Sequence, residues 1–200
     1  PELYEAWGTD KFDELYEKAE RKTSVWKTKV GAQELFFDIL KERAETGRIY
    51  IMNIDHSNDH SSFKDRIYMS NLCQEITLPT DPIQHIDGEG EIALCILSAI
   101  NVGKINKRDE LQPLCDLAVR ALDEIIDHQK YPIVAAEVST KARRSLGIGY
   151  IGLAHYLAKK GYRYDQKLAW RQVDKLTEAF QFYLLSASME VAKEKGKCDY

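Results

Sequence analysis

A nearly unbroken apolar run from Ile92 to Leu97 is the feature that most limits the folds open to this chain. A short run of this kind is typical of a strand buried on both faces, and such strands belong to parallel sheets that helices cover. Segments with helical periodicity lie on both sides of it, at 29–46, 109–129 and 168–195. The alternation predicts an α/β protein whose helices cover a largely parallel sheet.

The rest of the chain adds weaker signals. Residues 10–22 predict a charged helix, and Gly47 suits the position just after the end of the next helix. Residues 48–54, followed by a polar turn, and a stretch within 69–80 predict two more strands, whereas 145–162 begins with glycines and continues as a helix. No repeat, low-complexity segment or linker divides the chain, so all 200 residues are predicted to form one segment without an internal boundary.

Charge and cysteine content exclude several classes of protein. A net charge of -4 and a pI near 5.8 argue against nucleic-acid or membrane binding driven by bulk charge. No apolar run approaches the length of a membrane span. Four widely spaced cysteines do not resemble a disulfide framework or a zinc site, which favours a reducing cytoplasm. Because the chain begins with proline and ends just after a helical segment, we expect it to be a piece of a longer protein.

Three side chains that could take part in catalysis lie within "MSNLCQEITLPT", where Asn71, Cys73 and Glu75 occupy alternate positions. In a strand, alternate side chains point to the same face. A carboxylate there can take a proton from a substrate hydroxyl while a thiol reacts at the neighbouring carbon, and an amide can orient that hydroxyl. An edge strand with one polar, solvated face explains the same pattern equally well.

Glycines in "GIGYIG" match the GxGxxG pattern of dinucleotide-binding proteins, at Gly147, Gly149 and Gly152. That site needs a buried strand leading into the glycines and an acidic residue at a strand end about 20 positions later. Here the preceding residues, "STKARRS", are basic and polar, and the acidic candidates Asp165 and Asp174 lie in a turn and a helix. Close helix packing is the favoured explanation.

Two further clusters are weaker candidates. The polar turn at 55–60 gathers four possible metal ligands, but nothing else obviously completes a metal site, and such residues are normal in turns. These ligands are Asp55, His56, Asp59 and His60. Lys141, Arg143 and Arg144 could receive an anion at the start of a helix. In an acidic chain a solvated basic loop is the favoured explanation.

Longer motifs connect these residues to a known family. "SNLCQEITLP" and "GEIALCILSAINVGKIN" closely resemble the catalytic centre of the large (alpha) subunit of aerobic, class I ribonucleotide reductase. The likeness continues through "ERAETGRIYIMNIDH" and "RRSLGIGYIGLAHYLAKKG". It covers nearly the whole chain, as an internal segment of a longer family chain.

The resemblance implies a fold and a role for each site residue. The fold is a segment of a ten-stranded α/β barrel, built from two five-stranded halves, with a central finger loop that carries the catalytic cysteine. Cys73 matches that cysteine, which as a thiyl radical removes the 3′-hydrogen of a ribonucleotide. Glu75 matches the carboxylate that takes the 3′-hydroxyl proton, and Asn71 the amide that binds the ribose. Cys95 matches one of the two cysteines that reduce the 2′ position and become a disulfide.

The resemblance also implies partners. The substrate is a ribonucleoside diphosphate, and the products serve deoxyribonucleotide biosynthesis and DNA replication. The radical comes from a separate metal-containing beta subunit, and a thioredoxin- or glutaredoxin-type thiol restores the cysteines. The segment itself binds no metal or other cofactor, and nucleotide effectors bind outside it.

The resemblance leaves parts of the family enzyme unmatched. Neither Cys115 nor Cys198 matches the second redox cysteine, so the chain alone is expected to have no turnover. Unpaired strand edges of part of a barrel favour association or aggregation. The alternative is a non-catalytic regulatory or interaction fragment that keeps the fold.

Overall fold

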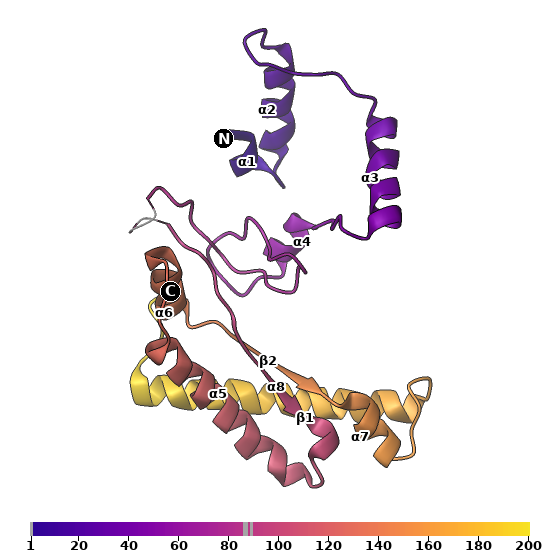
Figure 1. Ribbon diagram of the computed structural model, residues 1–200, viewed down its shortest axis with the longest axis vertical. Coiled ribbons are helices and arrows are strands. Elements are labelled where there is room, and N and C mark those ends of the chain that lie inside the picture. The colour runs from indigo at the N-terminus through magenta and orange to yellow at the C-terminus, as the bar shows by residue number, and fades with distance from the viewer. Residues whose placement is uncertain (1, 86–87, 89) are drawn as a thin grey trace. The chain divides into compact units, whose positions relative to one another are not determined.

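The computed structural model describes residues 2–85, 88 and 90–200, which form two compact units (Figure 1). One unit covers 1–80 and the other 81–200. Each is described by itself below. That all 200 residues form a single segment without an internal boundary stays a prediction.

The first unit contains helices, loops and turns. Its helices are α1 (Glu2–Ala6), α2 (Asp10–Arg21), α3 (Ala32–Thr46) and α4 (Ile54–Asp59). The helices predicted over 10–22 and 29–46 are confirmed as α2 and α3. Gly47 follows α3 in the left-handed conformation, with φ of 65°, and its N–H donates to Arg43 O at 3.0 Å. The C-terminal signal in the sequence was therefore correct.

The prediction of a strand over 48–54 is wrong, and so is the prediction that a polar turn directly follows it. Residues 48–53 have no regular secondary structure, and the first part of the predicted turn, 55–59, belongs to α4. The Asn58 carboxamide donates to Ile54 O at 2.8 Å and to Ile67 O at 2.9 Å, and accepts from Ile67 N at 2.9 Å. A side chain within the helix thus pairs with a distant backbone segment, a contact that local patterning cannot predict.

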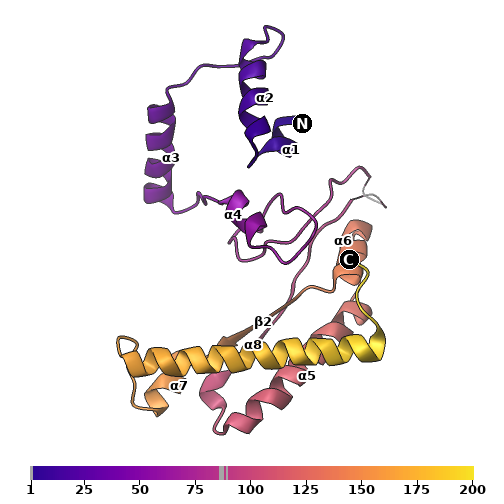
Figure 2. The same ribbon diagram turned by 180° about the vertical axis from the view of Figure 1, so that it is seen from behind.

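The second unit is an α/β assembly around two parallel strands. Its elements are β1 (Ile96–Asn101), η1 (Val102–Lys104), η2 (Arg108–Glu110), α5 (Leu111–His128), α6 (Val134–Arg143), β2 (Leu146–Ile151), α7 (Leu153–Lys159) and α8 (Lys167–Lys195). β1 and β2 pair in parallel from Ile96↔Leu146 to Asn101↔Ile151. Figure 2 shows the long helix α8 in front of both strands, alongside α5. The predicted α/β class and parallel pairing are confirmed.

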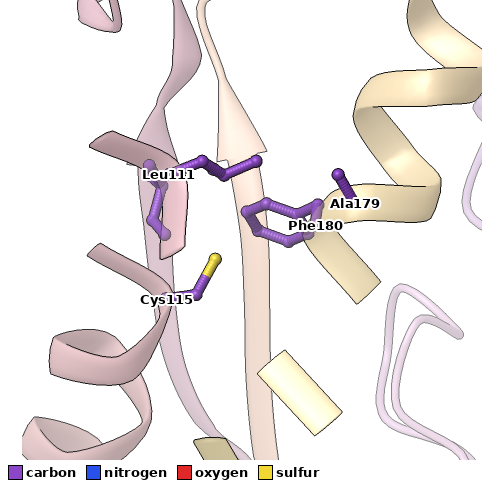
Figure 3. Packing of buried hydrophobic residues seen from close by; sticks show 5 residues of the cluster. Leu111, Cys115, Ala179 and Phe180 are labelled. Carbon is purple, nitrogen blue, oxygen red and sulfur yellow. The ribbon is translucent and has the colours of Figure 1, made fainter. Parts of the chain in front are cut away.

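The core of this unit lies between the strands, α5 and α8. Figure 3 shows Leu111 and Cys115 of α5 facing Ala179 and Phe180 of α8, in a cluster completed by Ile100 of β1. Burial raises the pKa of the Cys115 thiol to about 11. Cys115 is therefore a small core residue rather than a reactive one.

Burial of the first strand on both faces was predicted wrongly. β1 begins at Ile96, later than the apolar run, and its two faces differ. Ile100 is buried in the core cluster, whereas Leu97, which points to the other face, is 63% exposed. The face that carries Ile100 packs against α5 and α8, whereas Leu97, Ala99 and Asn101 on the other face of β1 are exposed.

The predicted solvated basic loop is also wrong. Arg143 ends α6 and pairs with Glu91, with Nη2 and Nε at 2.9 and 3.1 Å from Oε2. The two side chains are only 7% and 6% exposed. Arg144 pairs with Asp123 of α5 at 2.7 Å and with Asp127 at 2.9 Å. The carboxylates come from distant parts of the sequence, so the run looked solvated when viewed alone.

Asp123 shows how this charge network balances burial. Burial acts to raise the pKa of its carboxyl, but hydrogen bonds from Arg144 and Lys195 outweigh that effect and lower the pKa. The ionised carboxylate therefore joins the end of α6 to the end of α8 through α5.

The glycine-rich segment forms a strand, and the helix predicted to follow it is confirmed as α7. Gly147 and Gly149 lie within β2, and Gly152 precedes α7 with φ of 79°. A Cβ on Gly152 would overlap Asn101 Oδ1, which accepts a hydrogen bond from Gly103 N at 3.1 Å. Gly152 thus serves a close approach between two chain segments.

Gly152→Ala is expected to lower the free energy of unfolding by about 2 kcal/mol or more, because left-handed strain and the overlap with Asn101 add together. Gly161→Ala is the matched control. Gly161 has φ of 73°, but a Cβ there meets nothing within 4 Å, so only the strain of about 1 kcal/mol applies. Urea denaturation of both variants tests the difference. Equal losses would show that the contact with Asn101 has no importance.

Candidate active site

The residues Asn71, Cys73 and Glu75 lie in a tight turn. The prediction of a strand there is wrong. Asn71 N donates to Ile76 O at 3.3 Å, and Gln74 N donates to Asn71 O at 3.2 Å. The Asn71 side chain completes the closure, because its Oδ1 accepts from Ile76 N at 3.0 Å. We call this segment the Asn71–Ile76 turn.

The alternating row of side chains does not survive in this turn. Gln74 has φ of 64°, in the left-handed region that non-glycine residues seldom adopt. Such a residue interrupts the extended backbone between Cys73 and Glu75, so alternation no longer places them on one face. All three predicted site residues are exposed at the turn. The edge-strand explanation fails for the same reason.

The segment before the turn is well anchored within its unit. Ile67 is buried and pairs with the Asn58 carboxamide. The Arg66 guanidinium lies 3.9 Å from the centre of the Trp7 ring, and the Tyr68 ring stacks on Tyr4 at 5.6 Å. The exposed turn is therefore held by a chain segment with fixed contacts, which suits a group that must be precisely placed.

Cys95 belongs to the other unit and lies immediately before β1. The backbone there is already paired, since Ile96 N donates to Ser145 O at 3.2 Å. Cys95 is half-buried, and burial raises the pKa of its thiol. At neutral pH it is thus a protonated thiol, able to give up both a proton and an electron.

The four possible metal ligands at 55–60 form no metal site in the described part of the chain. Within residues 2–85, 88 and 90–200, no group of three or more His, Cys, Asp or Glu side chains could hold a metal ion. Asp55, His56 and Asp59 belong to α4, and His60 directly follows it. Among the same residues, no helix is both long and apolar enough to cross a membrane.

Two structural features of the site were missed in the sequence. One is the turn itself, which Asn71 could have signalled, because asparagine commonly bonds to backbone groups in turns. The other is the contact between Cys95 and the glycine side of β2, which depends on strand register. The sequence carries no local signal for that contact.

Comparisons with known proteins agree over the full chain. The family model described as ribonucleotide reductase, barrel domain, matches residues 1–200. The ribonucleoside-diphosphate reductase subunit alpha of Haemophilus influenzae is 55% identical over the whole chain, and subunit alpha of reductase 1 of Escherichia coli K12 is 52% identical. The subunit alpha of phage T4 is 39% identical. The chain spans 27% of the length of each of these relatives.

Proposed function

Because the chain belongs to the ribonucleotide reductase barrel-domain family, we propose that it is the active-site segment of a ribonucleoside-diphosphate reductase alpha subunit. Its reaction is the radical reduction of ribonucleoside diphosphates to deoxyribonucleotides. The observation that carries the proposal is the exposed, side-chain-closed turn that presents Cys73 between Asn71 and Glu75.

The Asn71–Ile76 turn supplies the groups for the first steps. Cys73, as a thiyl radical, takes the 3′-hydrogen atom of the substrate and becomes a thiol. Glu75 accepts the proton of the 3′-hydroxyl as a general base. Asn71 Oδ1 is engaged by Ile76 N, so the Nδ2 donors are the atoms that orient the substrate hydroxyl. A turn closed by its own first residue gives the thiol and the carboxylate a defined spacing.

Cys95 supplies half of the reducing power. Two thiols, Cys95 and a cysteine outside this chain, deliver two electrons and two protons. The 2′-hydroxyl leaves as water, a C2′–H bond forms, and the sulfurs join as a disulfide. Glu75 then returns its proton to the 3′-oxygen, and the Cys73 thiol returns its hydrogen atom to C3′. The C3′–H bond is thereby restored and Cys73 is again a thiyl radical. A thiol whose pKa is raised by burial stays protonated until it reacts, which suits a hydrogen donor. An external thioredoxin- or glutaredoxin-type thiol then reduces the disulfide.

The proposed architecture extends beyond this chain. β1 and β2 are two neighbouring strands of a ten-stranded barrel, and the Asn71–Ile76 turn is the tip of its finger loop. The parallel pairing of β1 with β2 and the family description as a barrel domain support this arrangement. The radical originates in a separate metal-containing beta subunit, nucleotide effectors bind outside the segment, and the enzyme acts in the cytoplasm.

A reconstitution assay tests the function. The complete alpha subunit that carries these residues is combined with a radical-generating beta subunit, a dithiol reductant and a ribonucleoside diphosphate. We expect deoxyribonucleotide formation that requires all four components, and none from the 200-residue chain in place of the complete subunit. Absence of product with every beta subunit tried would favour the alternative, a non-catalytic fragment that keeps the fold.

A further inference from the structure

The two faces of the β1–β2 sheet carry different side chains. Ile100, Ile148 and Tyr150 lie on the face that packs against α5 and α8. Because side chains alternate along a strand, Gly147 and Gly149 belong to the opposite face. Leu97 is the register partner of Gly147 in β1.

Gly147 lies against the sulfur of Cys95. A Cβ built on Gly147 would lie 2.9 Å from Cys95 Sγ and 2.5 Å from Leu97 Cδ2. Both distances are shorter than any normal carbon contact, so both groups would have to move. Both are also the ends of rotatable side chains, and the backbone at Gly147 has no left-handed φ. An alanine is therefore compatible with the strand, but not with the present position of the sulfur.

We propose that Gly147 is a positioning residue for Cys95. Because Gly147 has no side chain, it leaves the space that the Cys95 sulfur occupies. The functional meaning of this inference rests on the proposed redox role of Cys95. The contact between Gly147 and the Cys95 sulfur does not depend on that role. A disulfide forms only within narrow limits of sulfur separation and dihedral angle. A methyl group on Gly147 turns the Cys95 sulfur away from its present direction and covers one side of it.

Gly149 provides a matched control on the same strand and the same face. A Cβ on Gly149 meets nothing within 4 Å, so Gly149→Ala changes the strand composition without touching Cys95. A second control separates the two contacts of Gly147. Leu97→Ala, added to Gly147→Ala, removes the overlap with Leu97 and leaves the overlap with the sulfur.

The first measurement is the alkylation rate of Cys95 by iodoacetamide in the complete, reduced alpha subunit, followed by peptide mass spectrometry. We expect Gly147→Ala to slow alkylation about threefold or more, because the methyl group shields the sulfur and access governs thiol reactivity. Gly149→Ala is expected to match the wild-type rate, and Leu97→Ala is expected not to restore the rate of Gly147→Ala. Circular dichroism verifies that all variants fold.

The second measurement is the redox equilibrium of the Cys95 disulfide against dithiothreitol. Strained disulfides are easier to reduce, so Gly147→Ala is expected to shift the equilibrium about tenfold toward the dithiol, or about 30 mV for two electrons. Gly149→Ala is expected to leave it unchanged.

The outcomes separate this inference from the proposed function. Equal alkylation rates in Gly147→Ala and Gly149→Ala, or full restoration by Leu97→Ala, would overturn the positioning role. A wild-type subunit in which Cys95 forms no disulfide during turnover would instead overturn the redox assignment. In that case slowed alkylation in Gly147→Ala would still establish the contact.

Discussion

Replacement of Cys73 by serine is expected to reduce deoxyribonucleotide formation at least about 1,000-fold, the scale seen when a residue that makes or breaks the reacting bond is lost. Cys73 is exposed at the Asn71–Ile76 turn, so the substitution should leave the fold intact. A serine hydroxyl cannot replace the thiol, because an O–H bond is stronger than an S–H bond. Serine therefore does not form the radical that Cys73 is proposed to form. The measurement is product formation by the complete subunit with its radical source.

The matched control for this experiment is Cys198→Ser. Cys198 is also an exposed free cysteine, and its Sγ donates a hydrogen bond to a neighbouring backbone oxygen, Tyr200 O, at 3.3 Å. Activity is expected to stay at the wild-type level in this variant. Substantial turnover in Cys73→Ser would refute the mechanism proposed for the turn, whereas equal losses in both variants would indicate a general effect of removing thiols.

Loss of the Glu91 carboxylate is expected to cause the largest change in stability. Glu91→Gln is expected to lower the free energy of unfolding by about 3 kcal/mol, because it breaks a buried ion pair and leaves the Arg143 charge in a low-dielectric environment without that carboxylate. Both side chains are less than a tenth exposed, so water compensates little. Urea denaturation, followed by circular dichroism, measures the change.

An exposed ion pair of similar composition is the control for Glu91. Glu190 pairs with Lys193 on α8 at 2.6 Å, but both side chains are more than half exposed. Glu190→Gln is expected to have a much smaller effect, because solvent screens surface pairs. Similar losses in the two variants would contradict the role of burial assigned to the Arg143–Glu91 pair.

Helices were the part of the fold that the sequence predicted best. α2, α3, α5 and α8 all lie where apolar periodicity placed them, and Gly47 ends α3 as expected. Helical hydrogen bonds join residues four apart, and the apolar periodicity of a helix repeats over a similar distance. Both are therefore contained in the same short stretch of sequence.

Strands and charges were predicted less well because their partners lie far away in the sequence. The segment 48–54 has a strand-like pattern but forms no strand. β1 was placed a few residues early, and its exposed face was taken as buried. Arg143 looked solvated until Glu91, from another part of the chain, was seen beside it.

Sequence motifs alone identify the family and the residues of the candidate site, since Asn71, Cys73, Glu75 and Cys95 stand in motifs that need no coordinates. The way these residues are presented depends instead on contacts that form when the chain folds. A left-handed Gln74 and the bond from Ile76 N to Asn71 Oδ1 make a turn where alternation predicted a strand. Strand register, which depends on contacts across the chain, sets Gly147 against Cys95. Residue chemistry is local, whereas side-chain placement depends on long-range pairing.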